Sequence, residues 1–233
     1  MENKNFINAS ANAEIEEITE LVFIIDKSGS MSGFESDTVG GFNAMIEKQK
    51  KVAGEVLVST ILFDNYSEVI HDRERISDIK PMTVDDYRVG GCTALLDAIG
   101  DAVHHVENVH KYARREDVPK HTIFVITTDG MENASHRYTA GRVKNTIKRK
   151  TEADGWEFIF VAANIDAIET ADRLGIREER AANYRQSREG YVDCYSSLSD
   201  FVTMKRMAVP TADDGAWKRR LEREDNKNGK KSK

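Results

Sequence analysis

The chain is poor in cysteine. Only Cys92 and Cys194 occur among its 233 residues. Two cysteines are too few for the disulfide framework of a small secreted domain, and their wide separation excludes a CxxC metal site. We therefore expect both to be reduced thiols.

The sequence also lacks long apolar runs. No stretch approaches the roughly 18 apolar residues that a membrane-spanning helix needs. The first twenty residues, MENKNFINASANAEIEEITE, are polar and acidic, with no basic segment leading into an apolar one. That pattern does not predict a secretory signal. We expect a cytoplasmic protein with no membrane partner.

Positive charge is not in excess either. The 34 lysines and arginines are outnumbered by 40 acidic residues, which gives a formal net charge of -6. A generic nucleic-acid binder would carry a basic surface, so we expect no nucleic-acid partner.

What is present suffices for one core. With 39% hydrophobic residues, the length favours a single domain with polar ends. We assign 1–19 to an amino-terminal arm, 20–207 to the domain and 208–233 to a charged, flexible tail. Trp217 and Leu221 are apolar enough to anchor the first turn of that tail.

Strand-like and helix-like segments alternate along the domain. Runs rich in β-branched and aromatic residues predict strands at 21–25, 55–63, 67–71, 122–127 and 157–162. Apolar residues at helical spacing predict helices near 37–51, 94–112, 140–153, 167–174 and 191–207. This alternation predicts an α/β fold with a mainly parallel sheet and helices on both faces.

One connection is too short for a crossover. In LFDNYSEVI, strand-like residues lie on both sides of Asp64 and Asn65, which is typical of a hairpin. This hairpin would place one antiparallel strand at an edge of the sheet.

Polar residues cluster where three of these elements begin or end. Asp26 closes the first strand in IDKSGSM and is followed by Ser28 and Ser30. Asp129 closes a later strand, and Thr93 follows a Gly-Gly pair just before a helix. Open parallel sheets bind ligands at the carboxyl ends of their strands, so we expect these side chains to meet there.

The five residues offer only oxygen atoms. Carboxylate and hydroxyl oxygens suit hard cations, so this set favours Mg²⁺, with Mn²⁺ or Ca²⁺ as alternatives, and disfavours zinc. In Asp-x-Ser-x-Ser, one turn can direct alternate side chains to a single point, and Gly29 relieves backbone crowding there.

Taken singly, each element has an ordinary structural explanation. The segment from Asp26 to Ser30 could be a simple turn, Thr93 could cap the following helix, and Asp129 could end a strand. Their joint occurrence in order, each at an element boundary, favours a common site.

The motifs resemble those of von Willebrand factor A (vWA) domains, whose metal-ion-dependent adhesion site (MIDAS) reads DxSxS, then threonine, then aspartate. All five positions match: Asp26, Ser28, Ser30, Thr93 and Asp129. The likeness covers roughly 20–207, and the strings IDKSGSM, TALLDAI and TDG look most like small stand-alone intracellular bacterial or phage members.

The resemblance implies an open, doubly wound, Rossmann-like sheet. It also implies a function: a metal-dependent adaptor that captures a carboxylate from a protein partner. In the family the serines and, with ligand bound, the threonine contact the metal, while one or both aspartates act through water. The neutral hydroxyls leave the cation poorly compensated, so an Asp or Glu of the partner can complete its coordination.

Two other functions stay open. A Mg²⁺-dependent phosphatase of the haloacid-dehalogenase type also has an aspartate after its first strand, but it needs a second acid where this chain has Ser28. We therefore expect no enzyme. A nucleic-acid adaptor would rely on the lysine-rich tail alone.

We interpret several other histidine, cysteine and aromatic residues as structural. The spacing of His104, His105 and His110 disfavours a metal cluster, and Cys92 lacks a base that would make it a nucleophile. Trp156, Phe158 and Phe160 are expected to pack in the core or beside a strand.

Overall fold

The computed structural model describes residues 17–209, 213 and 215–222. Most of the predicted arm and tail therefore lies outside the described residues. Within the described part, no helix is both long enough and apolar enough to cross a bilayer.

The fold is α/β, and its centre is a mostly parallel sheet. The strands found among the described residues are β1 (Thr19–Asp26), β2 (Val56–Phe63), β3 (Ser67–Arg75), β4 (His121–Thr128), β5 (Glu157–Ala162) and β6 (Ala181–Asn183). They lie in the order β3-β2-β1-β4-β5-β6, and only the β2/β3 pair is antiparallel. The predicted antiparallel edge strand is confirmed. Ser67 pairs with Phe63 across a loop at 64–66.

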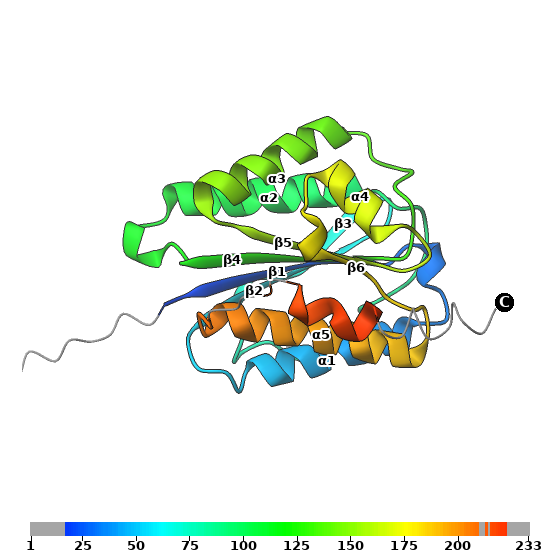
Figure 1. The fold of residues 1–233 in the computed structure, drawn as a ribbon, viewed down its shortest axis with the longest axis horizontal. Coiled ribbons are helices and arrows are strands. Elements are labelled where there is room, and N and C mark those ends of the chain that lie inside the picture. Colours follow the sequence, from blue (N-terminus) through cyan, green and yellow to red (C-terminus); the bar gives the residue numbers. More distant parts are fainter. Residues whose placement is uncertain (1–16, 210–212, 214, 223–233) are drawn as a thin grey trace, which may run out of the picture.

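Helices cover both faces of the sheet (Figure 1). The helices α1 (Glu35–Gln49) and α5 (Arg188–Arg206) lie on one face, and α2 (Leu95–Tyr112), α3 (Ala140–Asp154) and α4 (Ala167–Leu174) lie on the other. Short 3-10 turns occur at Gly29–Met31, Arg115–Asp117, Glu178–Arg180 and Ala216–Lys218. All five predicted helices are present, with ends shifted by up to three residues.

The central strand β1 shows why the sheet sits between two layers. Leu21, Phe23 and Ile25 point into the core shared with α1 and α5. Val22 and Ile24 point into the core under α2, α3 and α4. A strand buried on both faces reads as a continuous apolar run, as this one does.

Two contacts show how closely neighbouring elements pack. A Cβ atom on Gly41 of α1 would lie 2.2 Å from the ring of Tyr195 in α5, so only glycine permits this close helix contact. Trp217 and Leu221 are buried, and the Trp217 indole donates to the Glu179 carbonyl at 2.9 Å. This part of the tail packs on the domain, as its apolar residues predicted.

The sheet order positions the site. The chain runs from β1 to β2 on one side, and β4 lies on the other side of β1. The strand order therefore reverses between β1 and β4, and the crevice above their carboxyl ends is the place where open α/β sheets bind ligands.

Candidate functional site

Asp26 lies at the carboxyl end of β1 and is fully buried. One carboxylate oxygen accepts from the Ser28 N–H at 2.7 Å, and the other accepts from the Thr128 hydroxyl at the end of β4. The Tyr87 hydroxyl donates to the Asp26 carbonyl. The carboxylate is thus held in one orientation between the two central strands.

Ser28 and Ser30 lie on the turn that follows Asp26. Their hydroxyl oxygens are 3.0 Å apart, so alternate side chains of the turn do converge, as the spacing predicts. The Gly29 N–H donates to the Gly91 carbonyl at 3.1 Å, and a Cβ atom on Gly29 would lie 3.4 Å from that oxygen. The turn therefore packs closely against the loop that leads to Thr93.

Thr93 is held by the loop after β4. Its N–H donates to the Asn133 side-chain oxygen at 2.9 Å, and its carbonyl accepts from the Asn133 N–H at 3.0 Å. The N-cap of α2 is Ala94, without a side-chain capping bond. The simple capping explanation for Thr93 is therefore wrong.

Gly130 shows that these side chains meet. A Cβ atom built there would lie 2.7 Å from Thr93 Oγ1, 3.1 Å from Ser30 Oγ and 3.6 Å from Asp26 Oδ2. Three oxygens from two separate segments, the turn after β1 and the loop before α2, thus surround one point beside Gly130. A side chain at position 130 would occupy the space between them, which explains the glycine.

Asp129 completes the group, and half of its carboxylate lacks a partner. Oδ2 accepts from the Gln186 amide at 2.5 Å, whereas Oδ1 is buried and receives no hydrogen bond from any described residue. A buried carboxylate oxygen without a donor is costly unless a cation or water compensates it.

The electrostatics of the two carboxylates also fit a divalent cation. Burial raises the pKa of Asp26 above its usual value. Burial also raises the pKa of Asp129, a hydrogen bond from Ser30 opposes this rise, and the nearby Asp26 charge adds to it. A bound cation would compensate both charges. Two carboxylates and three hydroxyls therefore fit a hard divalent ion.

The structure brings together all five predicted residues and adds four that sequence reasoning missed. Thr128 and Tyr87 hold Asp26, Gln186 holds Asp129, and Asn133 holds Thr93. Gln186 also donates to the Ser30 carbonyl at 3.2 Å. Only Thr128, which lies beside Asp129, had a positional signal in the sequence.

The three histidines of α2 do not form a site. His104 contacts Asn108, His105 contacts Asp72, and His110 contacts Glu20. In the described part of the chain, no group of three or more His, Cys, Asp or Glu side chains is arranged to hold a metal. The carboxyl-edge site is of another kind, because hydroxyls supply most of its donors.

The predictions for the aromatic residues and the two cysteines also hold. Trp156, Phe158 and Phe160 are buried in the core beneath α2 and α3. Cys92 is an exposed free thiol, and Cys194 is a buried one.

Comparison with solved structures gives a consistent result. The chain is similar to a von Willebrand factor type A protein from Catenulispora acidiphila, with a TM-score of 0.56 and 11% identity over 81% of this chain and 43% of that one. It is also similar to the vWF domain of the type V pili tip protein Mfa5 from Porphyromonas gingivalis, with a TM-score of 0.58 and 8% identity over 85% of this chain and 99% of that domain. The fold is that of a vWA domain.

A third similar structure is proximal thread matrix protein 1 from the mussel byssus, with a zinc-occupied MIDAS motif. Its TM-score is 0.51, with 12% identity over 81% of this chain and 46% of that one. The chain thus spans less than half the length of this protein and of the Catenulispora protein. No family model matches the sequence, and no curated protein matches it. At these identities the likeness concerns the fold.

Proposed function

We propose that this chain is a metal-dependent protein-binding module. Asp26, Ser28, Ser30, Thr93 and Asp129 would hold a divalent cation, Mg²⁺ in the first instance, at the carboxyl edge of the sheet. One observation carries the proposal. Oδ1 of Asp129 is buried and has no hydrogen-bond partner among the described residues, and the next residue, Gly130, is the point around which the Thr93, Ser30 and Asp26 oxygens converge.

The donor chemistry supports the choice of ion. Neutral hydroxyls and carboxylates are the oxygen ligands that suit hard cations such as Mg²⁺, Mn²⁺ and Ca²⁺. The byssus protein has a zinc-occupied MIDAS motif, so a related fold does hold a divalent ion in such a motif.

The charge balance supports the choice of ligand. Three of the five donors are neutral, and the resemblance implies that one or both aspartates act through water, so a bound cation would offer an electrophilic position to an anion from outside. We propose that this anion is an Asp or Glu carboxylate of a protein partner. The likeness to the Mfa5 pilus-tip domain is consistent with protein binding.

The site offers little for catalysis. A phosphatase of the type considered above needs an acid at position 28, but Ser28 stands there with its hydroxyl against Ser30. We therefore propose a binding role and no enzymatic one. We also propose that the protein acts in the cytoplasm. Turnover of a phosphoester in Mg²⁺ that Asp26→Asn abolishes would reverse this choice.

The cation is tested by Mn²⁺ titration, monitored by electron paramagnetic resonance. Asp129→Ala removes the poorly satisfied carboxylate and should weaken Mn²⁺ binding by roughly 10- to 100-fold, the usual effect of losing a supporting group at a metal site. The control Asp172→Ala removes an exposed carboxylate on α4, 84% exposed, and should leave the affinity unchanged. Equal affinities in both variants would contradict the proposed ligand set.

The partner carboxylate is tested by selecting displayed peptides on the immobilised chain in Mg²⁺ and eluting them with chelator. The eluted peptides should share an Asp or Glu, and changing that residue to Asn or Gln should abolish binding. The Asp129→Ala chain should capture none of them. Selected peptides that stay bound in chelator, or that lack a common acid, would refute carboxylate capture.

A further inference from the structure

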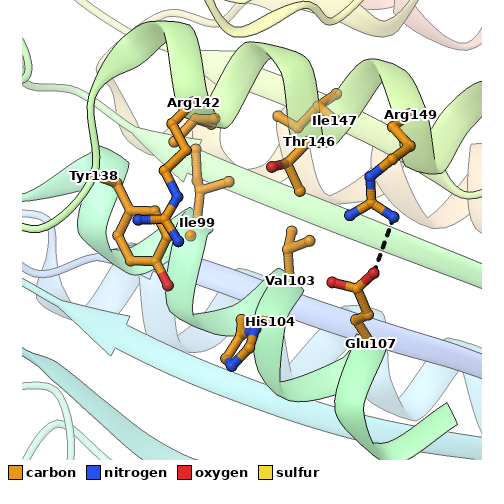
Figure 2. Close-up of a pocket in the computed structure, with 11 residues that line it drawn as sticks. Ile99, Val103, His104, Glu107, Tyr138, Arg142, Thr146, Ile147 and Arg149 are labelled. Carbon is orange, nitrogen blue, oxygen red and sulfur yellow. Dashed lines mark hydrogen bonds and ion pairs between the residues drawn. The ribbon is translucent and has the colours of Figure 1, made fainter. Parts of the chain in front are cut away.

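A cavity lies between α2 and α3, away from the carboxyl-edge site (Figure 2). Its volume is about 150 Å³. Its apolar wall comes from Ile99 and Val103 on α2 and from Val143 and Ile147 on α3, all buried. The rest of the lining is polar or charged and includes His104, Thr146 and Arg149. A cavity of about this volume has room for a single benzene ring.

One end of the cavity is built by Tyr138 and Arg142. A Cβ atom on Gly100 would lie 2.5 Å from the Tyr138 ring, so the glycine makes room for that ring. The Arg142 guanidinium stacks over the ring, 4.8 Å from its centre, as Figure 2 shows. This stacking places a cation in the lining of the cavity, beside Tyr138.

Arg142 has no acidic partner in the part of the chain that the structure describes. Asp101, the acid next to Tyr138, is bound by Arg137 at 2.8 Å. Among the described residues, none forms an ion pair or a side-chain hydrogen bond with the Arg142 guanidinium. Its planar set of N–H donors is therefore free to bind a carboxylate from outside.

At the other end of the cavity the charged side chains are paired with one another. Glu107 contacts both Arg149 and Lys150 at 2.9 Å. Hydrogen bonds from Arg149 and Lys150 lower the pKa of Glu107 to about 2, so it remains ionised and paired. Figure 2 shows Glu107 and Arg149 at the end opposite Tyr138 and Arg142. The cavity thus has one unpaired cation, at one end only.

We propose that this cavity binds a small aromatic carboxylate, with its ring between α2 and α3 and its carboxylate on Arg142. The ligand class follows from three features: space for one ring, aliphatic side chains from both helices in the lining, and a single unpaired guanidinium. This site is independent of the proposed cation site, and its occupancy needs no metal.

The test uses the full chain in chelator with benzoate as the probe, monitored by amide chemical shifts and calorimetry. Benzoate should saturate and shift the amides of Val103, Val143 and Ile147. Benzyl alcohol, which keeps the ring and lacks the charge, should bind roughly tenfold or more weakly, because a hydrogen bond to a charged group is lost.

Two variants locate the carboxylate. Arg142→Gln should weaken benzoate binding by roughly tenfold or more and leave benzyl alcohol unchanged. The control Lys148→Gln removes an exposed charge of α3 outside the cavity and should change neither affinity. The proposal is overturned if benzoate does not saturate, if its shifts map elsewhere, or if it binds the Arg142→Gln chain as well as the original.

Discussion

Glu20 is the most deeply buried carboxylate outside the site. Its side chain has no exposed surface, and it contacts Arg73 on β3 and His110 on α2, the latter at 2.5 Å. Arg73 lies in the left-handed backbone region with φ of 52°, near an irregularity in the β2/β3 register. An unusual backbone conformation at a sheet edge thus accompanies an ion pair in the core.

Removing the Glu20 charge should destabilise the fold strongly. Glu20→Gln leaves Arg73 and His110 without their anion, and breaking a buried pair from one side costs roughly 3 kcal/mol. Urea unfolding at pH 7 measures this loss. Glu68→Gln breaks the exposed pair with Lys27 and should cost less than about 1 kcal/mol. Similar losses in the two variants would show that the buried pair has no special weight.

At the scale of elements, the loop after β4 is fastened to the start of α2. Asp97 accepts from the N–H groups of His136, Arg137 and Tyr138 at 2.9 to 3.0 Å. Glu132 accepts from the Leu96 N–H at 2.9 Å. The segments that carry Thr93 and Asp129 are therefore held together by carboxylates outside the site.

Asp97 gives a pH-dependent prediction. Burial alone would raise its pKa, but the three backbone N–H groups and Arg137 outweigh burial and hold the pKa below its usual value. A carboxylate with a lowered pKa contributes its full stabilisation above the pKa of the unfolded chain, which is about 4 for aspartate. This contribution disappears as pH falls through the lower pKa of the folded chain.

Asp97→Asn should therefore lose roughly 1–3 kcal/mol at pH 7, because it weakens hydrogen bonds to a charged acceptor. The difference from the unaltered chain should shrink as pH falls from 5 to below 3. Urea unfolding at three pH values measures it. A difference that stays constant with pH would show that the charge of Asp97 does not matter.

The elements also show what the sequence can predict. Short runs of β-branched and aromatic residues and apolar residues at helical spacing are local signals, and they located five strands and five helices. The strand β6, Ala-Ala-Asn, is three residues long and has no β-branched residue, so it carried no signal. Its place depends on pairing with β5, which is a tertiary effect.

The site residues also fall into two groups, those that local sequence signals predict and those that only tertiary contacts place. Five site residues stand at predicted element boundaries, where the sequence pattern indicates a cation site: Asp26, Ser28, Ser30, Thr93 and Asp129. Gln186 reaches Asp129 from a loop 57 positions away, and Asn133 reaches Thr93 across 40. Such supporting contacts depend on how loops pack, and no periodicity in the sequence encodes them.

For the whole molecule, stability resides in two apolar layers and not in the site. One core lies between the sheet and α1 with α5, and the other lies under α2, α3 and α4. The five oxygen donors lie at one edge of this structure. Hydroxyl ligands bind a cation too weakly to drive folding as a structural zinc ion does.

Chelator should therefore lower the melting temperature without unfolding the chain. At a Mg²⁺ concentration ten times the dissociation constant, linkage contributes about 1.4 kcal/mol, which corresponds to about 3–6 °C for a domain of this size. Circular dichroism at 20 °C should keep its helical signal in EDTA. The Asp129→Ala chain, which binds the ion poorly, should melt at nearly the same temperature with Mg²⁺ or EDTA. Loss of helical signal on adding EDTA to the unaltered chain would mean that the cation is part of the fold, and the division between core and site drawn above would be wrong.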